Sequence, residues 1–185
     1  LLILLVSIFC IFVLIAMILP MGPNSTQTII YPYMPEGKDI LYVPEINPFM
    51  IEARRFSLSN STDLNHPTGA VIVKDGVILG HGANHSIFKN KFFVKLHGKG
   101  LCVRKWLKAK SGTKYWLCPG CVTNKNHAEA SAVRDAVEKH GPDKVRGSDI
   151  YLWGHWWCCK PCWDSIIAAG IINVHLQEGS NQTFK

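Results

Sequence analysis

Two short motifs restrict the fold of this chain more than any other feature, because each places candidate metal ligands at the start of a predicted helix. They are His127-Ala128-Glu129 and Cys159-Lys160-Pro161-Cys162. The partial positive charge at a helix N-terminus favours the thiolate form of cysteine, which a zinc ligand needs. If one imidazole and two thiolates share a zinc ion, the two helix starts must lie side by side in the fold.

The donor set also indicates the kind of site. Three protein ligands leave the fourth tetrahedral position of zinc open for water, which is typical of a catalytic site, whereas four ligands mark a structural one. Zinc lowers the pKa of a bound water to about 7, so hydroxide is available at neutral pH. Glu129 lies two residues from His127 and can take the proton of that water. The motifs therefore predict metal-assisted hydrolysis.

Two structural interpretations compete with this one. Asn126 and Glu129 have the spacing of a capping box, in which the glutamate only caps its helix. The pair Cys118 and Cys121 could join the later cysteine pair in a four-cysteine site, although the gap between the pairs exceeds the usual length of about 15–20 residues. The order of the elements favours catalysis: a hairpin, the helix with the histidine, a strand, the helix with the cysteines and a last strand.

The hydrophobic pattern predicts strands that alternate with helices. Two β-branched runs flank Asp75-Gly76, which is a strong hairpin signal. Strands that alternate with helices are typical of an α/β layered domain with parallel pairing. Residues 85–125, rich in lysine and glycine, fit no regular pattern. The expected elements are a helix at 48–58, a hairpin at 70–79, strands at 150–153 and 171–176, and helices that begin at Asn126 and Cys159.

The charge of the chain is unevenly distributed. The formal net charge is +7, and no acidic residue occurs between Asp75 and Glu129, a stretch rich in lysine. A basic balance favours anionic partners such as nucleotides, nucleic acid or a membrane surface. The lysine-rich stretch is either a solvated basic face or a wall beside a pocket that attracts phosphate.

The cysteines are grouped like metal ligands rather than like a disulfide framework. Six of the seven fall between Cys102 and Cys162, with histidines nearby, which indicates a reducing compartment. The candidate ligands of a second, structural zinc are Cys102, Cys118 and Cys121, together with His97 or His85. Free structural cysteines are the alternative.

In these motifs and their order, the sequence resembles the zinc-dependent cytidine and deoxycytidylate deaminase superfamily. The segment 68–84 is similar to the family's opening hairpin, and 162–174 is similar to its third helix and the following strand. The resemblance implies a three-layer α/β/α domain with a mixed four- to five-stranded sheet. It also implies zinc held by His127, Cys159 and Cys162, and hydrolytic deamination in which Glu129 moves the protons.

The deoxycytidylate branch fits best. Cys102-x-Arg104, Ser111-Gly112 and Cys118 are similar to a segment of that branch. The resemblance therefore implies conversion of dCMP to dUMP and ammonia, with substrate contacts from Asn84 and Ala128, and with Arg104 against the phosphate. It implies a small-molecule nucleotide substrate and a homo-oligomer.

Some residues depart from the family pattern. Cys158 stands where the family usually has proline, so it could compete with Cys159 for the metal. The run His155-Trp156-Trp157 is unusual, and its tryptophans either stack on a base or pack in the core. Other substrates stay open: cytidine, guanine, or a base within RNA. A rival of a different class is a non-catalytic zinc-binding module.

Composition divides the chain into four parts. These are an apolar segment at 1–20, a proline-rich linker at 21–46, the zinc-dependent deaminase domain at 47–178, and a tail at 179–185. The apolar segment forms a hydrophobic N-terminal helix that is a membrane anchor or a buried core helix, or it is an upstream stretch wrongly joined to a protein that starts at Met21 or Met34. We expect a cytoplasmic catalytic domain, tethered to the membrane if the anchor is genuine.

Overall fold

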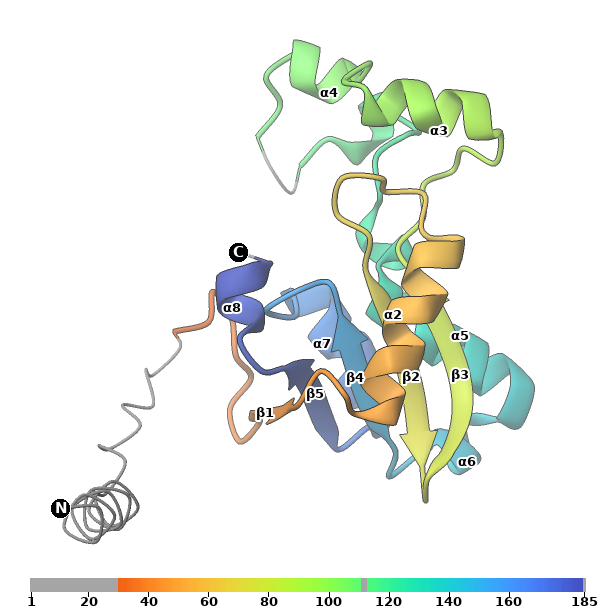
Figure 1. The fold of residues 1–185 in the computed structure, drawn as a ribbon, viewed down its shortest axis with the longest axis vertical. Helices are drawn as coiled ribbons and strands as arrows, with labels where there is room; N and C mark the ends of the chain where they lie inside the picture. The colour runs from red at the N-terminus through yellow and green to blue at the C-terminus, as the bar shows by residue number, and fades with distance from the viewer. Residues whose placement is uncertain (1–29, 111–112, 185) are drawn as a thin grey trace, which may run out of the picture. The chain divides into compact units, whose positions relative to one another are not determined.

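A mixed five-stranded sheet forms the centre of the fold in the computed structural model, which describes residues 30–110 and 113–184 (Figure 1). The strand order is β1-β5-β4-β2-β3. β1 and β4 both pair with β5 in parallel, whereas β2 is antiparallel to β4 and to β3. The strands are β1 (Ile40–Val43), β2 (Gly69–Lys74), β3 (Val77–Ala83), β4 (Asp149–Trp153) and β5 (Asn173–Gln177).

Helices cover both faces of this sheet, and the sequence of β2 explains why. Ala70 and Ile72 belong to the core on one face, whereas Val71 and Val73 pack with Met50 on the other. Successive side chains of a strand point to opposite faces, so a strand that is apolar at every position needs cover on both. The expected three-layer α/β/α architecture is therefore confirmed. One face carries α2 (Pro48–Asn60), and the other carries α5 (Ala128–His140), α6 (Pro142–Val145) and α7 (Lys160–Ala168) (Figure 1).

Local sequence signals account for the start of α2 and for the β2–β3 turn. The Oδ1 atom of Asn47 accepts hydrogen bonds from the backbone N–H groups of Phe49 and Met50 at 3.0 and 3.3 Å, and so caps α2. In the hairpin turn, Asp75 and Gly76 have φ angles of 51° and 76°. Two residues with positive φ are what a type I′ turn requires, so the predicted hairpin forms where Asp-Gly occurs.

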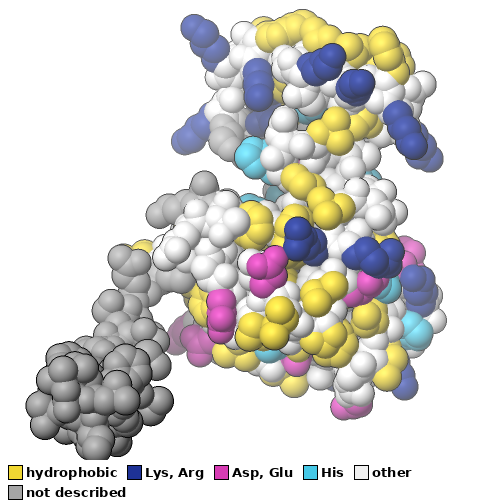
Figure 2. Space-filling model, viewed as in Figure 1, with side chains coloured by type: hydrophobic (Ala, Val, Ile, Leu, Met, Phe, Trp, Pro, Cys, Tyr) yellow, Lys and Arg dark blue, Asp and Glu magenta, His cyan; other side chains and the backbone are white. Residues whose placement is uncertain are grey.

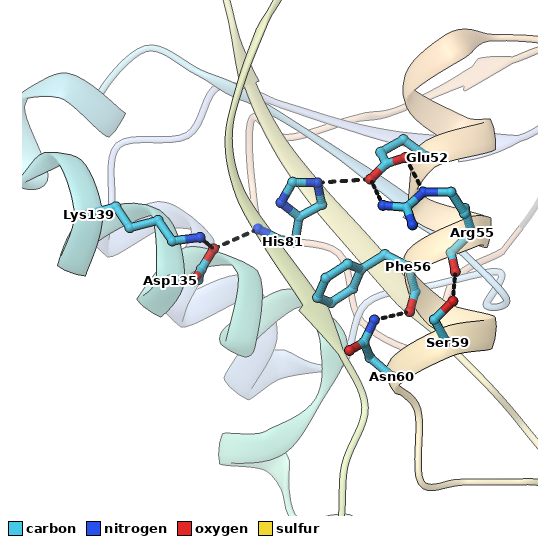
Figure 3. A network of polar contacts seen from close by, with 8 residues as sticks. All are labelled: Glu52, Arg55, Phe56, Ser59, Asn60, His81, Asp135 and Lys139. Carbon is cyan, nitrogen blue, oxygen red and sulfur yellow. Dashed lines mark hydrogen bonds and ion pairs between the residues drawn. The ribbon is translucent and has the colours of Figure 1, made fainter.

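Polar contacts hold the edge strand β3 between helices of the two faces (Figure 3). His81 Nε2 lies 3.0 Å from Glu52 Oε1 of α2, while the His81 backbone N–H donates to Asp135 Oδ2 of α5 at 2.9 Å. Arg55 and Lys139 each approach one of these carboxylates at 2.7 Å. Through His81, the edge of the sheet is therefore linked to a helix on each face.

Residues 85–126, called the insert below, connect β3 to α5. They contain two short helices, α3 (Lys91–Gly98) and α4 (Val103–Trp106), followed by 3₁₀ turns at Tyr115–Leu117 and Asn124–Asn126. Asn90 caps α3 by accepting a hydrogen bond from the Phe92 N–H at 2.8 Å. Val94 is the one buried residue of α3, and α4 has none. The helices of the insert therefore gain little stability from apolar burial.

Two elements differ from the expected division of the chain. β1 (Ile40–Val43) lies within the predicted linker 21–46, where it pairs with β5. It escaped prediction because it is an edge strand with exposed central residues, so its sequence shows no buried apolar run. The short helix α8 (Ser180–Thr183) lies within the predicted tail 179–185.

The predicted hydrophobic N-terminal helix at 1–20 lies outside the described residues, as does the first part of the linker. Along the described stretches, no helix has the length and apolar character needed to cross a bilayer.

Candidate functional site

Both motifs lie at helix N-termini on the same face of the sheet, as expected. His127 is the N-cap residue of α5 and Cys159 that of α7, with Cys162 in the first turn of α7. α5 packs on β2 and β3, α7 follows β4, and the two helices contact each other. Because β2 and β4 are neighbours, the sheet sets the two helix starts side by side.

The structure brings His127, Cys159 and Cys162 together. His127 Nδ1 lies 3.6 Å from Cys159 Sγ and 3.5 Å from Cys162 Sγ, and the three ligand atoms lie within 4.8 Å of one another. Tetrahedral zinc, with bonds of about 2.3 Å to sulfur and about 2.0–2.1 Å to nitrogen, separates those two atom types by about 3.6 Å. The donor set and its spacing therefore fit zinc.

The pKa values of the two thiols of this trio shift in opposite directions. A hydrogen bond from Cys162 lowers the pKa of Cys159 to about 4, an effect that burial opposes and the His127 ring reinforces. The same contact with Cys159, together with burial, raises the pKa of Cys162. One thiolate is therefore present at neutral pH, and metal binding releases the second proton.

Glu129 lies next to the trio, in the first turn of α5. The residue is 5% exposed, and its burial raises the pKa of the carboxyl group, against the opposing effect of His127. A raised pKa brings a carboxyl group closer to the working pH, which favours its use as a general acid and base. The capping box of Asn126 and Glu129 does not form, because the N-cap residue of α5 is His127, whose side chain makes no capping hydrogen bond.

Cys158, the competing ligand, lies in the apolar core. It is fully buried among the residues between the sheet and helices α5 and α7. That burial raises the pKa of its thiol well above the ordinary value. The geometry thus groups Cys159, and not Cys158, with His127.

A cavity of about 650 Å³ opens beside the trio. Its size is typical of small-molecule sites, which span about 300–1,000 Å³. His127, Glu129 and Cys159 form part of its lining, and the insert forms another part. The lining also includes the residues predicted to bind substrate, Asn84, Arg104 and Ala128, together with Lys105, Tyr115, His155 and Trp157.

Asn84 uses its amide to organise the loop that borders the cavity. Its Oδ1 atom accepts hydrogen bonds from the Thr68 N–H at 2.9 Å and the Ser61 hydroxyl at 2.6 Å. Its Nδ2 atom donates to the His66 carbonyl oxygen at 2.8 Å. Asn84 therefore shapes the cavity wall, and its predicted substrate contact stays a prediction.

Arg104 lines the cavity and also makes contacts within the insert through all three guanidinium nitrogens, so its predicted phosphate contact stays a prediction. Nε donates to the Thr113 carbonyl at 2.9 Å, Nη2 to the Lys110 carbonyl at 3.2 Å, and Nη1 to Cys121 Sγ at 3.5 Å. The neighbouring Lys105 also lines the cavity, and its ammonium group makes no hydrogen bond or ion pair with another described residue. Lys105 is therefore the better-placed cation.

His155 is a cavity residue to which the sequence analysis assigned no role. Its Nδ1 atom accepts hydrogen bonds from the backbone N–H groups of Trp156 and Trp157 at 3.0 and 3.3 Å. Burial, with a smaller effect of His127, lowers the pKa of His155 to about 4, so the ring is neutral at pH 7. With Nδ1 as acceptor, the ring proton resides on Nε2. The unusual run of residues 155–157 was the available sequence signal.

A second group of ligand atoms lies in the insert. The predicted cysteines Cys102, Cys118 and Cys121 come together, and of the two candidate histidines His97 joins them, with all four ligand atoms within 4.8 Å of one another. His85 does not belong to this group. The four-cysteine site built from both CxxC pairs is wrong, because each pair belongs to a group of its own.

Comparison with known proteins gives one family and several solved structures. A family model described as the cytidine and deoxycytidylate deaminase zinc-binding region matches residues 45–178. No curated protein matches the chain. A dCMP deaminase from cyanophage S-TIM5, solved with dCMP and dUMP, is 23% identical, with 70% of this chain and 79% of that chain covered and a TM-score of 0.43.

Two further solved structures are similar to this chain. Guanine deaminase from Bacillus subtilis is 18% identical, with 73% of this chain and 66% of that chain covered and a TM-score of 0.40. The other, from Thermotoga maritima, is 24% identical over 69% of this chain, with a TM-score of 0.40. It is a single protein described as a diaminohydroxyphosphoribosylaminopyrimidine deaminase/5-amino-6-(5-phosphoribosylamino)uracil reductase. The present chain spans 28% of the length of that protein.

Proposed function

Because this chain belongs to the cytidine and deoxycytidylate deaminase zinc-binding family, a family of hydrolytic deaminases that act on C–N bonds, we propose that it converts dCMP to dUMP and ammonia. The observation that carries the proposal is the buried carboxyl group of Glu129, which lines one cavity together with His127 and Cys159. A structural metal site has no need of such a carboxyl group.

The trio of His127, Cys159 and Cys162 is the proposed zinc site. Its two sulfurs and one nitrogen fit tetrahedral zinc and leave one position open. Zinc bound there would supply hydroxide at neutral pH, because it lowers the pKa of a coordinated water to about 7. The other steps belong to side chains of this chain.

Glu129 moves the protons in this proposal. Its carboxylate takes a proton from the attacking water and passes it to the ring nitrogen N3 of the base. Hydroxide adds to C4, the carbon that carries the amino group. Glu129 then relays the remaining hydroxyl proton to that amino group, so the C–N bond breaks and ammonia leaves. Water and dCMP thus give dUMP and ammonia, and the Glu129 carboxylate is restored.

Groups around the cavity would hold the nucleotide. Asn84 and the backbone at Ala128 border the space beside Glu129 and are the proposed contacts to sugar and base. Lys105 is the proposed phosphate contact, since a cation that lines the cavity and has no partner among the described residues can pair with an anion. The predicted homo-oligomer stays a proposal, and light scattering of the purified chain measures it.

A base within RNA is the second candidate substrate, and the surface of the insert favours it. Figure 2 shows lysine and arginine side chains beside hydrophobic ones at the top of the molecule. Phe92, Trp106 and Trp116 of the insert are exposed, and so are its lysines Lys95 and Lys99. Exposed aromatic and basic side chains together can stack on bases and neutralise phosphates. An affinity that falls steeply with salt would favour RNA.

Ammonia release by the purified, zinc-loaded full chain tests the proposal. The substrate panel is dCMP, CMP, cytidine, guanine and a structured RNA. We expect turnover of dCMP that disappears in Glu129→Gln while that variant keeps its zinc. Glu138→Gln, an exposed position of the same helix α5, is the matched control and should retain activity.

The other outcomes are equally informative. Turnover of a different panel member would keep the proton-transfer role of Glu129 and replace the substrate. Silence across the panel, in a folded protein that holds zinc, would overturn the proposal in favour of a non-catalytic zinc module. Equal activity in Glu129→Gln would exclude Glu129 as the proton carrier.

A further inference from the structure

We propose that His97, Cys102, Cys118 and Cys121 form a second zinc site, closed by four protein ligands, which holds the insert in place as a wall of the cavity. The four residues come from three short elements and one turn of the insert. His97 lies in the last turn of α3, Cys102 is the N-cap residue of α4, and Cys118 ends the first 3₁₀ turn. Cys121 follows in a tight turn, where its N–H donates to the Cys118 carbonyl at 3.0 Å.

The distances between the ligand atoms fit a tetrahedral metal. Cys121 Sγ lies 3.5 Å from Cys102 Sγ and 3.5 Å from His97 Nε2. Tetrahedral zinc separates two sulfurs by about 3.8 Å and a sulfur from a nitrogen by about 3.6 Å, given its usual bond lengths. A disulfide would need about 2.05 Å between the sulfurs. The cluster thus has the spacing of ligands around one ion.

The backbone is shaped to fit the histidine ring into this cluster. A β-carbon placed on Gly120 would lie 2.4 Å from His97 Cδ2, far inside contact distance. Only glycine at the centre of the Cys118–Cys121 turn lets the imidazole approach. The turn therefore presents two sulfurs and leaves room for the nitrogen ligand.

Buried residues are few along the described part of the insert. Among its described residues, the buried cluster consists of Cys102, Cys118 and Cys121, with Tyr115 packed against it. Those cysteines are 3%, 4% and 8% exposed. Segments too short to bury an apolar core usually depend on a metal or on disulfides, and a structural zinc contributes its binding energy to folding.

Arg104 supports this site from outside the ligand set. Three thiolates and one neutral imidazole around Zn²⁺ leave a net charge of −1. The guanidinium group donates to Cys121 Sγ at 3.5 Å and lies 4.3 Å from the centre of the Tyr115 ring. Its other nitrogens bind the carbonyls of Lys110 and Thr113. Arg104 thus offsets the charge and ties the loop to the cluster, which makes it a positioning residue.

The zinc content of the full chain tests the inference without any use of turnover. We expect two zinc ions per chain in the wild type. The double variant Cys118→Ser with Cys121→Ser should hold one, and so should Cys159→Ser with Cys162→Ser. Two zinc ions in the first variant, or one in the wild type that disappears with Cys159 and Cys162, would overturn the second site.

A measurement on the wild type covers the case in which a variant fails to fold. After cadmium substitution, the ¹¹³Cd spectrum should show two resonances, one of them in the range of three sulfurs and one nitrogen. A single resonance would overturn the inference. Arg104→Gln should keep both metals but weaken the second site by about 10–100-fold in chelator competition, with partial recovery in Arg104→Lys. An inactive protein with two zinc ions would refute the proposed function alone.

Discussion

The backbone of Gly82 in β3 lies directly against that of Ala128 in α5: a β-carbon on Gly82 would come within 2.1 Å of the Ala128 carbonyl oxygen and 2.3 Å of the Ala132 nitrogen. Ala128 stands between His127 and Glu129. Strand and helix therefore meet without an intervening side chain at the point where α5 carries the proposed ligand and proton carrier.

Gly82→Ala tests that contact. Because the obstructing atoms are backbone, they cannot move aside without shifting α5, so we expect a loss of about 1–3 kcal/mol in the free energy of unfolding. Gly98→Ala is the control, since its new methyl group would meet only the Leu64 side chain at 3.2 Å. Urea unfolding compares the two. A Gly82→Ala variant as stable as Gly98→Ala would show that α5 is not held in this way.

Lys105→Ala tests the proposed phosphate contact. We expect the KM for dCMP to rise by about tenfold, roughly the effect of one charge-assisted hydrogen bond, while the KM for deoxycytidine stays unchanged. Steady-state kinetics with both substrates measures the difference. Lys95→Ala removes the same charge from an exposed position of α3 and should leave both values unaltered. An equal change for nucleotide and nucleoside would rule out a phosphate contact.

His155→Phe tests the neutral imidazole of the cavity. Its Nε2–H is available as a donor, because Nδ1 accepts the N–H groups of residues 156 and 157. Phenylalanine keeps a ring but removes that donor, so we expect kcat/KM to fall by about tenfold with zinc content unchanged. The exposed His140, at the end of α5, supplies the control His140→Phe. Unchanged kinetics in His155→Phe would leave this residue a purely structural role.

His175 should make stability depend on pH. Burial lowers its pKa, partly offset by Asp149, whose Oδ2 atom lies 3.5 Å from Nε2, and the ring stacks on Tyr151 at 4.3 Å. The folded protein therefore keeps this ring neutral at pH values where the unfolded chain binds a proton. Its contribution is complete above about pH 6.5 and is lost as the pH falls toward the folded pKa.

Urea unfolding between pH 7.5 and 5.5 measures this effect. The free energy of unfolding should fall with decreasing pH, and His175→Gln should reduce the slope by at most about 1.4 kcal/mol per pH unit. Other groups, including the cysteine ligands, affect both proteins alike, so the difference reports His175. Parallel curves for the two proteins would contradict the prediction.

Local signals made much of the fold predictable. The Asp75-Gly76 pair between β-branched runs made the hairpin predictable, because few residue pairs adopt positive φ at two consecutive positions. Gly141 and Gly170, with φ angles of 79° and 72°, follow the C-terminal ends of α5 and α7 within two residues. The spacing of His127, Cys159 and Cys162 identified residues that converge in space, because each motif begins a helix.

Tertiary structure alone decided how distant side chains pair. The sequence determined the hairpin, the helix starts and the candidate ligands, since these follow from local periodicity, turn geometry and residue type. It could not choose between His85 and His97 as a ligand, and it could not show that Arg104 donates to Cys121. It also could not detect β1, whose central residues are exposed. Such choices depend on which segments the fold brings into contact, and a pattern read along the chain carries no distances between segments far apart.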